Sequence, residues 1–135
     1  MTAPHSYWFH YTRPENAEAI CESGQYSVGT KANPTALCGL YLTDIPPGAR
    51  EQDILTILFA SQRDEINVRG VVVLRRQLLT PLLDDRINTG RRRGQGYQKK
   101  LFVAECGTTL DLSLSIVGYG RRDVRHWLYH GSVYA

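Results

Sequence analysis

The sequence has no apolar run that approaches the roughly 20 residues a helix needs to cross a bilayer. Its first five residues lack the basic and apolar regions of a secretory signal. Internal repeats and linker-like stretches are also missing from its 135 residues. We therefore expect one soluble domain over residues 1–135, with no membrane partner and a cytoplasmic site of action. Delivery as an effector by another apparatus would leave no mark in such a chain.

Cysteine is scarce as well. Cys21, Cys38 and Cys106 are odd in number and include no C-x-x-C pair, which argues against a disulfide framework and a structural zinc site. We expect reduced thiols that pack as small apolar groups. His126 and His130 have the i, i+4 spacing of helical metal ligands, but their segment has a strand pattern and lacks the glutamate of H-E-x-x-H. No metal is expected.

Charge of one sign is not strongly dominant, since the formal net charge is +3. Basic residues concentrate at 91–93 and 99–100, among three glycines. Composition favours a solvated loop over residues 88–100. The alternative is a segment that holds the phosphates of a nucleotide or nucleic acid.

The apolar patterning predicts an α+β chain with about five to seven short strands and two helices in its N-terminal part. The expected helices cover residues 15–23, with Thr12 as N-cap and Gly24 as the stop, and residues 51–60. Residues 25–38 are expected to be a loop. The expected strands are 7–12, 39–44, a buried central strand at 70–74, 101–105, 110–116 and an edge strand at 127–134.

Two of these strands carry groups suited to a ligand site. The first offers His10 and Tyr11, and the second offers Tyr41 in a Gly-Leu-Tyr-Leu-Thr-Asp run that stops at two prolines. Singly, a strand histidine is more often a hydrogen-bonded core residue, and strands are rich in tyrosine. Because the two motifs occur in this order around a short helix, we predict that their strands face each other across a cleft.

This order of motifs resembles the ADP-ribosyltransferase superfamily of the diphtheria-toxin and poly-ADP-ribose-polymerase type. The similarity is closest to the toxin-associated HYD1-type ADP-ribosyltransferase family, and it rests on His10-Tyr11-Thr12, the helix ending at Gly24, and residues 39–44. It covers the first third of the chain. The resemblance implies a small fold of two packed, antiparallel-rich β-sheets around an NAD cleft, with short N-terminal helices.

The resemblance also implies that NAD is the substrate, and it assigns roles to residues. His10 would bond a ribose hydroxyl, the backbone of Tyr11 beside Thr12 would hold the carboxamide, and Tyr41 would stack on the nicotinamide ring. The remaining expected NAD-binding positions are Ser27, Gly39 and Asp44. For Asp44, capping the turn before the two prolines is the alternative role.

The third catalytic position departs from the family pattern. Where the family has a carboxylate before a late strand, residues 97–100 are Tyr-Gln-Lys-Lys. Glu105 at the far end of that strand is the expected substitute, and Asp111 is the other candidate. A strand-end residue pointing to water is the structural alternative for Glu105.

We therefore expect an NAD-consuming enzyme that cleaves the nicotinamide–ribose bond, as an ADP-ribosyltransferase or an NAD glycohydrolase. A protein or nucleic-acid acceptor, a toxin role and an immunity partner follow from the resemblance. Two alternatives stay open. One is a non-catalytic module that binds ADP-ribose or a nucleotide, favoured by the missing acid. The other is an RNA-binding or 2′-phosphotransferase-like protein that uses the basic segment with Tyr97 and Tyr119 as stacking partners.

Overall fold

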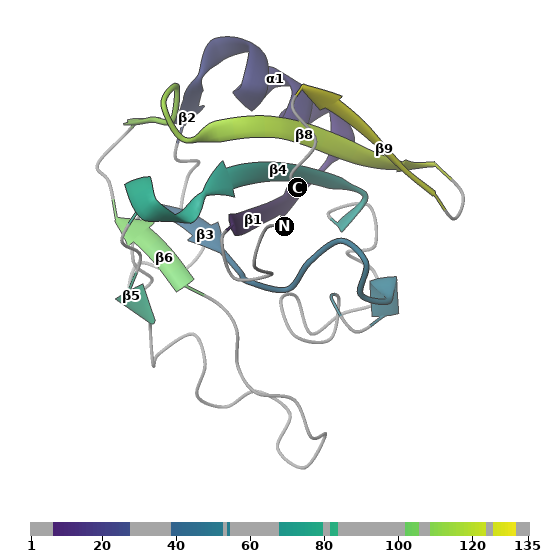
Figure 1. Cartoon of the computed structure of the whole chain (residues 1–135). Helices are drawn as coiled ribbons and strands as arrows, with labels where there is room; N and C mark the ends of the chain where they lie inside the picture. The colour runs from purple at the N-terminus through teal and green to yellow at the C-terminus, as the bar shows by residue number, and fades with distance from the viewer. Residues whose placement is uncertain are drawn as a thin grey trace.

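Four antiparallel strands in the order β1-β4-β8-β9 form the sheet on which the chain is built (Figure 1). They are β1 (Tyr7–Thr12), β4 (Gly70–Arg75), β8 (Ile116–Asp123) and β9 (His126–Gly131). A computed structural model describes residues 7–27, 39–52, 54, 68–79, 82–83, 102–105, 109–123 and 126–131, with the backbone alone at 78, 82–83, 102–105 and 123. Within these residues the chain is a small mixed α+β domain.

The remaining elements surround this sheet. Helix α1 (Pro14–Ser23) packs against β4 and β8. Strand β3 (Gly39–Leu42) pairs with β6 (Phe102–Glu105), and β6 pairs with β5 (Leu82–Leu83) in a three-stranded sheet. Strand β2 (Gln25–Ser27) pairs with β7 (Thr109–Asp111), and the short 3₁₀ helix η3 (Arg76–Leu78) follows β4. All of the strand pairs are antiparallel.

Strand β4 confirms the prediction of a buried central strand. Its Gly-Val-Val-Val-Leu run lies between β1 and β8, and these five residues are all buried. Continuous β-branched residues suit a strand that is covered on both faces, because neither face then has to meet water. Strands β1, β3 and β9 also lie where the sequence predicts strands, and β9 is the end strand of its sheet.

Helix α1 begins and ends close to the predicted residues. Pro14 occupies its first turn, and Gly24 ends it in the left-handed conformation (φ 70°), with its N–H donating to the carbonyl of Ile20 at 2.8 Å. The predicted N-cap, Thr12, is wrong, because Arg13 holds that position without a side-chain hydrogen bond. No helix in the described residues is both long and apolar enough to span a bilayer.

Cys21 of α1 is a free thiol that packs, partly buried, against the core, as the sequence predicts. Burial raises the pKa of this thiol to about 11. The thiol is therefore protonated and poorly nucleophilic near neutral pH. Cys38 and Cys106 lie outside the described residues.

Alternate residues of β1 enter two separate core clusters. Trp8 belongs to the first cluster, which lies on the α1 side and includes Ala17 and Ile20. Phe9 and Tyr11 belong to the second cluster on the opposite face of the strand. Because His10 alternates with them, its side chain shares the face of Trp8. Strand β1 thus carries core residues on both faces and a histidine among them.

Several predicted elements differ from the observed ones. The predicted strand over 110–116 is only partly confirmed, because β7 ends at Asp111 and β8 begins at Ile116. Between them the chain turns, and the carboxylate of Asp111 accepts hydrogen bonds from the N–H and hydroxyl of Ser113. The predicted loop over 25–38 begins instead with β2. The described residues contain nine strands rather than five to seven.

Only part of the second predicted helix can be compared. Residues 51, 52 and 54 are helical, and the remainder of 51–60 lies outside the described residues. The basic segment over 88–100 lies outside them as well.

The segment after β3 is tied to the sheet by a partly buried ion pair. Arg122 of β8 contacts Glu51 at 3.1 Å, and Arg69 contacts the same carboxylate at 3.6 Å. The indole N–H of Trp127 and the guanidinium of Arg122 both donate to the carbonyl of Pro47, at 2.7 and 3.5 Å. These contacts fix the position of the chain that leaves the second sequence motif.

We expect Glu51→Gln to lower the free energy of unfolding by about 1–3 kcal/mol, because it leaves two guanidinium groups with a neutral partner at a partly buried site. The matched control is Glu15→Gln, which removes an exposed pair with Arg13 and is expected to change stability by less than about 0.5 kcal/mol. Urea unfolding of the two variants measures both values. Equal effects would contradict a role for the Glu51 network.

Candidate functional site

Strands β1 and β3 meet where the sequence predicts a site. The N–H of Phe9 donates to the carbonyl of Thr43 at 2.8 Å, and the N–H of Thr43 donates back to Phe9 at 2.9 Å. One residue further along β1, the Nδ1 atom of His10 lies 2.8 Å from the carbonyl oxygen of Tyr41. The two sequence motifs are therefore joined by hydrogen bonds, although His10 and Tyr41 are 31 positions apart in the chain.

His10 is held as a neutral imidazole. The residue is 9% exposed, and burial lowers the pKa of its ring from the ordinary value of 6.5, while the Tyr41 carbonyl raises it to a smaller extent. A carbonyl oxygen only accepts, so Nδ1 carries the proton and donates to Tyr41. Nε2 then presents a lone pair, and it has no hydrogen-bond partner among the described residues. The ring is therefore prepared to accept a hydrogen bond from a ligand.

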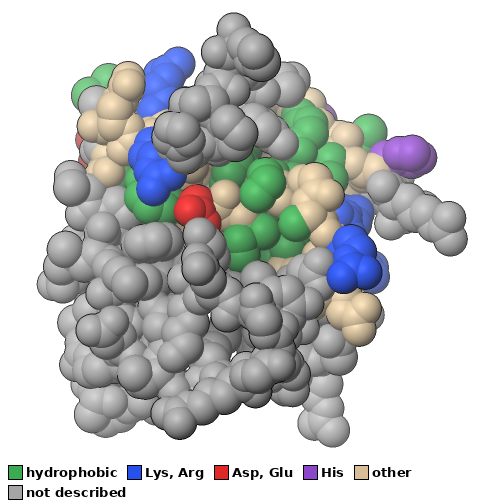
Figure 2. Space-filling model, turned by 60° about the horizontal axis from the view of Figure 1, so that its bottom comes forward, with side chains coloured by type: hydrophobic (Ala, Val, Ile, Leu, Met, Phe, Trp, Pro, Cys, Tyr) green, Lys and Arg blue, Asp and Glu red, His purple; other side chains and the backbone are tan. Residues whose placement is uncertain are grey.

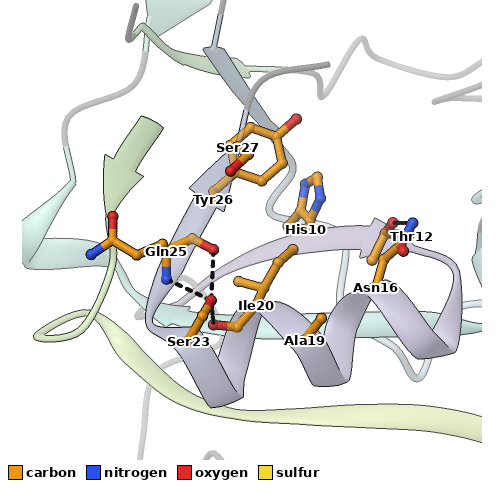
Figure 3. A pocket seen from close by; sticks show the side chains of 9 residues that line it. All are labelled: His10, Thr12, Asn16, Ala19, Ile20, Ser23, Gln25, Tyr26 and Ser27. Carbon is orange, nitrogen blue, oxygen red and sulfur yellow. Dashed lines mark hydrogen bonds between the residues drawn. The ribbon is translucent and has the colours of Figure 1, made fainter. Parts of the chain in front are cut away.

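A pocket of about 470 Å³ adjoins this histidine (Figure 3). Two strands and the helix between them supply its walls: β1, α1 and β2. The ring of Tyr26 meets the ring of His10 edge to face, with centroids 5.4 Å apart and planes at 72°. The nine lining residues are His10, Thr12, Asn16, Ala19, Ile20, Ser23, Gln25, Tyr26 and Ser27.

The pocket combines an aromatic and apolar wall with small polar groups. Asn16 donates to the hydroxyl of Thr12 at 3.5 Å, and Ser23 bonds the backbone of Gln25, so several of these polar groups are already oriented. Most of the lining side chains are polar, with Ala19 and Ile20 as the apolar ones, and several polar groups that converge on a concave site are able to orient a small molecule. The arrangement suits a nucleoside, which has a flat base and a sugar with hydroxyl groups.

The predicted site residues divide between this pocket and the other side of β3. His10, Thr12 and Ser27 line the pocket. The Tyr11 hydroxyl donates to the carbonyl of Ile45 at 2.7 Å, and its ring lies in the second cluster. Tyr41 is partly exposed and packs against that second cluster as well. His10 and Tyr41 therefore meet through the Tyr41 carbonyl, and their rings lie on different sides.

Hydrophobic side chains gather in the middle of the face that is turned away from α1 in Figure 1, with Lys and Arg side chains on either side (Figure 2). The second cluster contributes partly buried side chains around its core, among them Tyr41, Ile45 and Ala49. The Tyr41 ring thus belongs to an apolar region distinct from the His10 pocket.

Gly39 and Glu105 are paired across β3 and β6. Gly39 is buried at the start of β3, and the backbone of Glu105 lies opposite it. Tyr41 is opposite Val103 in the same register, two residues away from Glu105. The backbone of the candidate acid is therefore close to the second motif.

Asp44 is partly exposed and directly follows Thr43 of the β1 bridge. In the turn before the two prolines, the hydroxyl of Thr43 accepts a hydrogen bond from the N–H of Ile45 at 3.2 Å. Thr43 therefore contributes a hydrogen bond to the turn that, in the sequence analysis, Asp44 is the alternative candidate to cap.

Asp111 has a structural task. It lies in β7 opposite Gln25, and the N–H and the hydroxyl of Ser113 donate to its carboxylate at 3.0 and 2.7 Å. These bonds lower the pKa of the exposed Asp111 carboxyl, the backbone N–H having the larger effect. A carboxylate held ionised in its own turn, and outside the pocket lining, is the weaker candidate for the third catalytic position.

Sequence reasoning missed Tyr26 and the helical residues of the pocket. Asn16, Ile20 and Ser23 recur at spacings of three and four residues, which brings them to one face of α1. That spacing was available in the sequence. Tyr26 carried no such signal, because β2 is three residues long and its segment was expected to be a loop.

The lowered pKa of His10 predicts a pH dependence of stability. Near and below pH 6.5, His10 of the unfolded chain binds a proton, whereas the folded ring stays neutral because its pKa is lowered. Neutral His10 therefore contributes its full share of the free energy of unfolding above this pH, and that share is lost as the pH falls from 6.5 through the lowered pKa of the folded state. We expect urea unfolding between pH 7.5 and 5 to reveal a loss of stability that is smaller in His10→Gln. The same loss in both proteins would contradict the assignment.

Among the described residues, no three His, Cys, Asp or Glu side chains are grouped as metal ligands would be.

Comparison with known proteins does not identify a family for this chain. No protein-family model, no curated protein and no solved structure matches the chain.

Proposed function

We propose that the chain is an NAD-consuming enzyme with an ADP-ribosyltransferase-like fold, which binds NAD across β1 and β3 and breaks its nicotinamide–ribose bond. The observation that carries the proposal is the neutral, buried His10, which lines the pocket and donates from Nδ1 to Tyr41, so that Nε2 is left as an acceptor. A ribose hydroxyl is a donor that matches this acceptor. The hydroxyl and amide groups of Thr12 and Asn16 lie in the same pocket for the rest of the sugar.

The backbone of Tyr11 is suited to hold the nicotinamide carboxamide. In an antiparallel strand, the N–H and C=O of alternate residues point to the same edge. Phe9 bonds Thr43 through its N–H and C=O, so those of Tyr11, two residues on, are directed to the β3 side of β1. A carboxamide has one donor and one acceptor of its own, and it complements such a pair.

Tyr41 supplies the aromatic face for the nicotinamide ring. Its side chain is partly exposed beside an apolar cluster, and it is on the other side of β3 from Leu40 and Leu42 of the first cluster. The two ends of NAD would therefore bind on two sides of the β1–β3 junction. A cationic aromatic ring stacks favourably on tyrosine.

Glu105 is the preferred third catalytic residue. Its backbone lies opposite Gly39, within two residues of Tyr41 in the β3–β6 register, whereas Asp111 is ionised within its own turn. A carboxylate near the ribose stabilises the oxocarbenium-like charge as the C1′–N bond breaks. Neutral nicotinamide leaves with the bonding electrons, and a water or acceptor nucleophile then forms the new bond to C1′ and gives up its proton. NAD glycohydrolysis and ADP-ribosylation differ only in that nucleophile.

The biological role that we propose rests on the family resemblance alone. A protein or nucleic acid would be the acceptor of ADP-ribose, and an effector or toxin of this kind would be neutralised by an immunity partner. The non-catalytic alternative uses the same pocket to hold ADP-ribose or a nucleotide without bond cleavage. The RNA-binding alternative is less well supported, because the ring of Tyr119 is already stacked on His130 at 4.8 Å.

The test is nicotinamide release from NAD by the purified protein, with and without candidate acceptors. Tyr41→Ala and Glu105→Gln should each reduce release strongly, while Asp111→Asn serves as the matched carboxylate control and should retain it. NAD binding without release under any condition would favour the binding-module alternative. The absence of both NAD binding and nicotinamide release would refute the proposed function.

A further inference from the structure

We infer that Tyr11 and Trp127 are positioning residues, whose side chains hold the second sequence motif and the turn after it in the place that the reaction needs. The inference rests on the proposed function, in which the ring of Tyr41 stacks on nicotinamide. Neither side chain has to touch NAD, since each acts on the chain that follows Tyr41. The role of the Tyr11 hydroxyl is separate from that of the Tyr11 backbone, which the proposed function gives to the carboxamide.

Alternate carbonyl groups of residues 41–47 accept hydrogen bonds from other parts of the chain, and the first two of them are bonded to β1. The Tyr41 carbonyl lies 2.8 Å from Nδ1 of His10. The Thr43 carbonyl accepts from the N–H of Phe9, also at 2.8 Å. Strand β3 ends one residue before Thr43, so the second of these bonds already lies beyond the regular strand.

The next two alternate carbonyl groups are bonded by side chains instead. The hydroxyl of Tyr11 donates to the carbonyl of Ile45 at 2.7 Å. The indole N–H of Trp127 donates to the carbonyl of Pro47, also at 2.7 Å. Residues 46 and 47 are both proline, which has no backbone N–H with which to continue a strand ladder. Side-chain donors from β1 and β9 therefore take over where backbone pairing stops.

The donors are themselves held in place. Tyr11 is 6% exposed, and its ring centroid lies 6.4 Å from that of Trp127. The guanidinium of Arg122 lies 5.1 Å from the centroid of the Trp127 ring, over its face. The side chains of Tyr41 and Ile45 pack against the second cluster, which also contains Tyr11. The position of the Tyr41 ring therefore depends on the bond that the Tyr11 hydroxyl makes.

The reaction is sensitive to that position. Nicotinamide has to leave along the line of its bond to the ribose, and a stacking ring that is displaced by about 1 Å can cost as much as 100-fold in rate. A residue that fixes the ring therefore contributes to turnover without contacting the substrate.

The first experiment measures steady-state nicotinamide release by the full chain with Tyr11→Phe, which keeps the ring and the backbone and removes only the hydroxyl. We expect kcat/KM to fall by about tenfold, the effect of one lost hydrogen bond to a group that orients the substrate. The matched control is Tyr119→Phe, which removes a tyrosine hydroxyl that bonds Glu18 on the α1 side of the sheet. That control should leave release unchanged.

A double-mutant cycle with Tyr41→Ala separates positioning from stability. In the wild-type background, Tyr11→Phe should weaken calorimetric NAD binding by about threefold or more. In the Tyr41→Ala background it should weaken binding by less than about twofold, because the ring on which it acts is gone. Urea unfolding should show the same loss of stability from Tyr11→Phe in both backgrounds. A merely structural role would leave the binding effects additive.

Each outcome bears on a separate statement. Wild-type release by folded Tyr11→Phe would overturn the inference and leave the proposed function standing. Additive effects in the cycle would overturn the action through Tyr41. If Tyr11→Phe does not fold, Trp127→Phe, which keeps an aromatic ring and lacks the indole N–H, is read in the same way. The absence of both NAD binding and release in wild type would overturn the proposed function, and the inference with it.

Discussion

Replacing His10 by alanine is expected to lower kcat/KM for nicotinamide release by about 10- to 100-fold, the effect of losing one buried hydrogen-bond acceptor together with the shape of the pocket. Alanine also removes the donor to the Tyr41 carbonyl, so β3 loses one of its ties to β1. We expect the same variant to lose about 1–3 kcal/mol of stability. Steady-state kinetics and urea unfolding measure the two effects separately.

Two variants separate chemistry from folding. His10→Gln keeps an N–H that reaches toward Tyr41 and an oxygen that accepts, so it should restore most of the stability and only part of the activity. His130→Ala removes an exposed histidine that stacks on Tyr119, and it should leave turnover unchanged. Wild-type turnover in folded His10→Ala would exclude His10 from the site.

Gly118→Ala is expected to prevent stable folding, with a loss above about 3 kcal/mol, because overpacking against backbone cannot be relieved by a rotamer change. An added Cβ at this position would overlap the carbonyl oxygen of His130 in the neighbouring strand β9. The β8–β9 pair would have to separate at the end where Gly118 lies opposite Gly131 to accept the methyl group. Circular dichroism and thermal unfolding measure the result.

The matched control is Gly48→Ala. A Cβ at Gly48 meets no atom within 4 Å, so this exchange should change stability by less than about 0.5 kcal/mol. Gly120→Ala should fall between the two, since the neighbour at 2.7 Å is the Tyr129 ring, which can turn. A folded Gly118→Ala with wild-type stability would disprove the close approach of β8 and β9.

The same glycines explain why β8 was not predicted from the sequence. Strand prediction depends on apolar residues at alternate positions, and β8 has Gly118 and Gly120 where side chains would repeat. Their absence of side chains permits the close approach of β9, which only the folded structure reveals. Strand β4 was predictable for the opposite reason, because its continuous run of β-branched residues indicates a strand that is buried on both faces.

The sequence motifs of the candidate site were predictable, but the residues that line its pocket were not. His10 and Tyr41 stand out in the sequence, and their strands do lie together. The sequence does not indicate that the Tyr41 ring would share a cluster with Tyr11, since this depends on which face of β3 packs against that side of β1. Tyr26 was missed because β2 is ordered by its partner β7, 80-odd residues away, and long-range pairing leaves no local periodicity.

Strand β1 is synthesised first and acquires its neighbours late. Its sheet partner β4 begins at Gly70, and β4 in turn lies against β8, which ends at Asp123. Non-local pairing of this kind is formed slowly, because the loop has to close before the contacts stabilise it. During translation, His10 therefore remains outside this sheet until β4 has left the ribosome. The pocket also needs β2, whose partner β7 follows β4 in the chain, so the proposed NAD site would be assembled only after β7 has been synthesised.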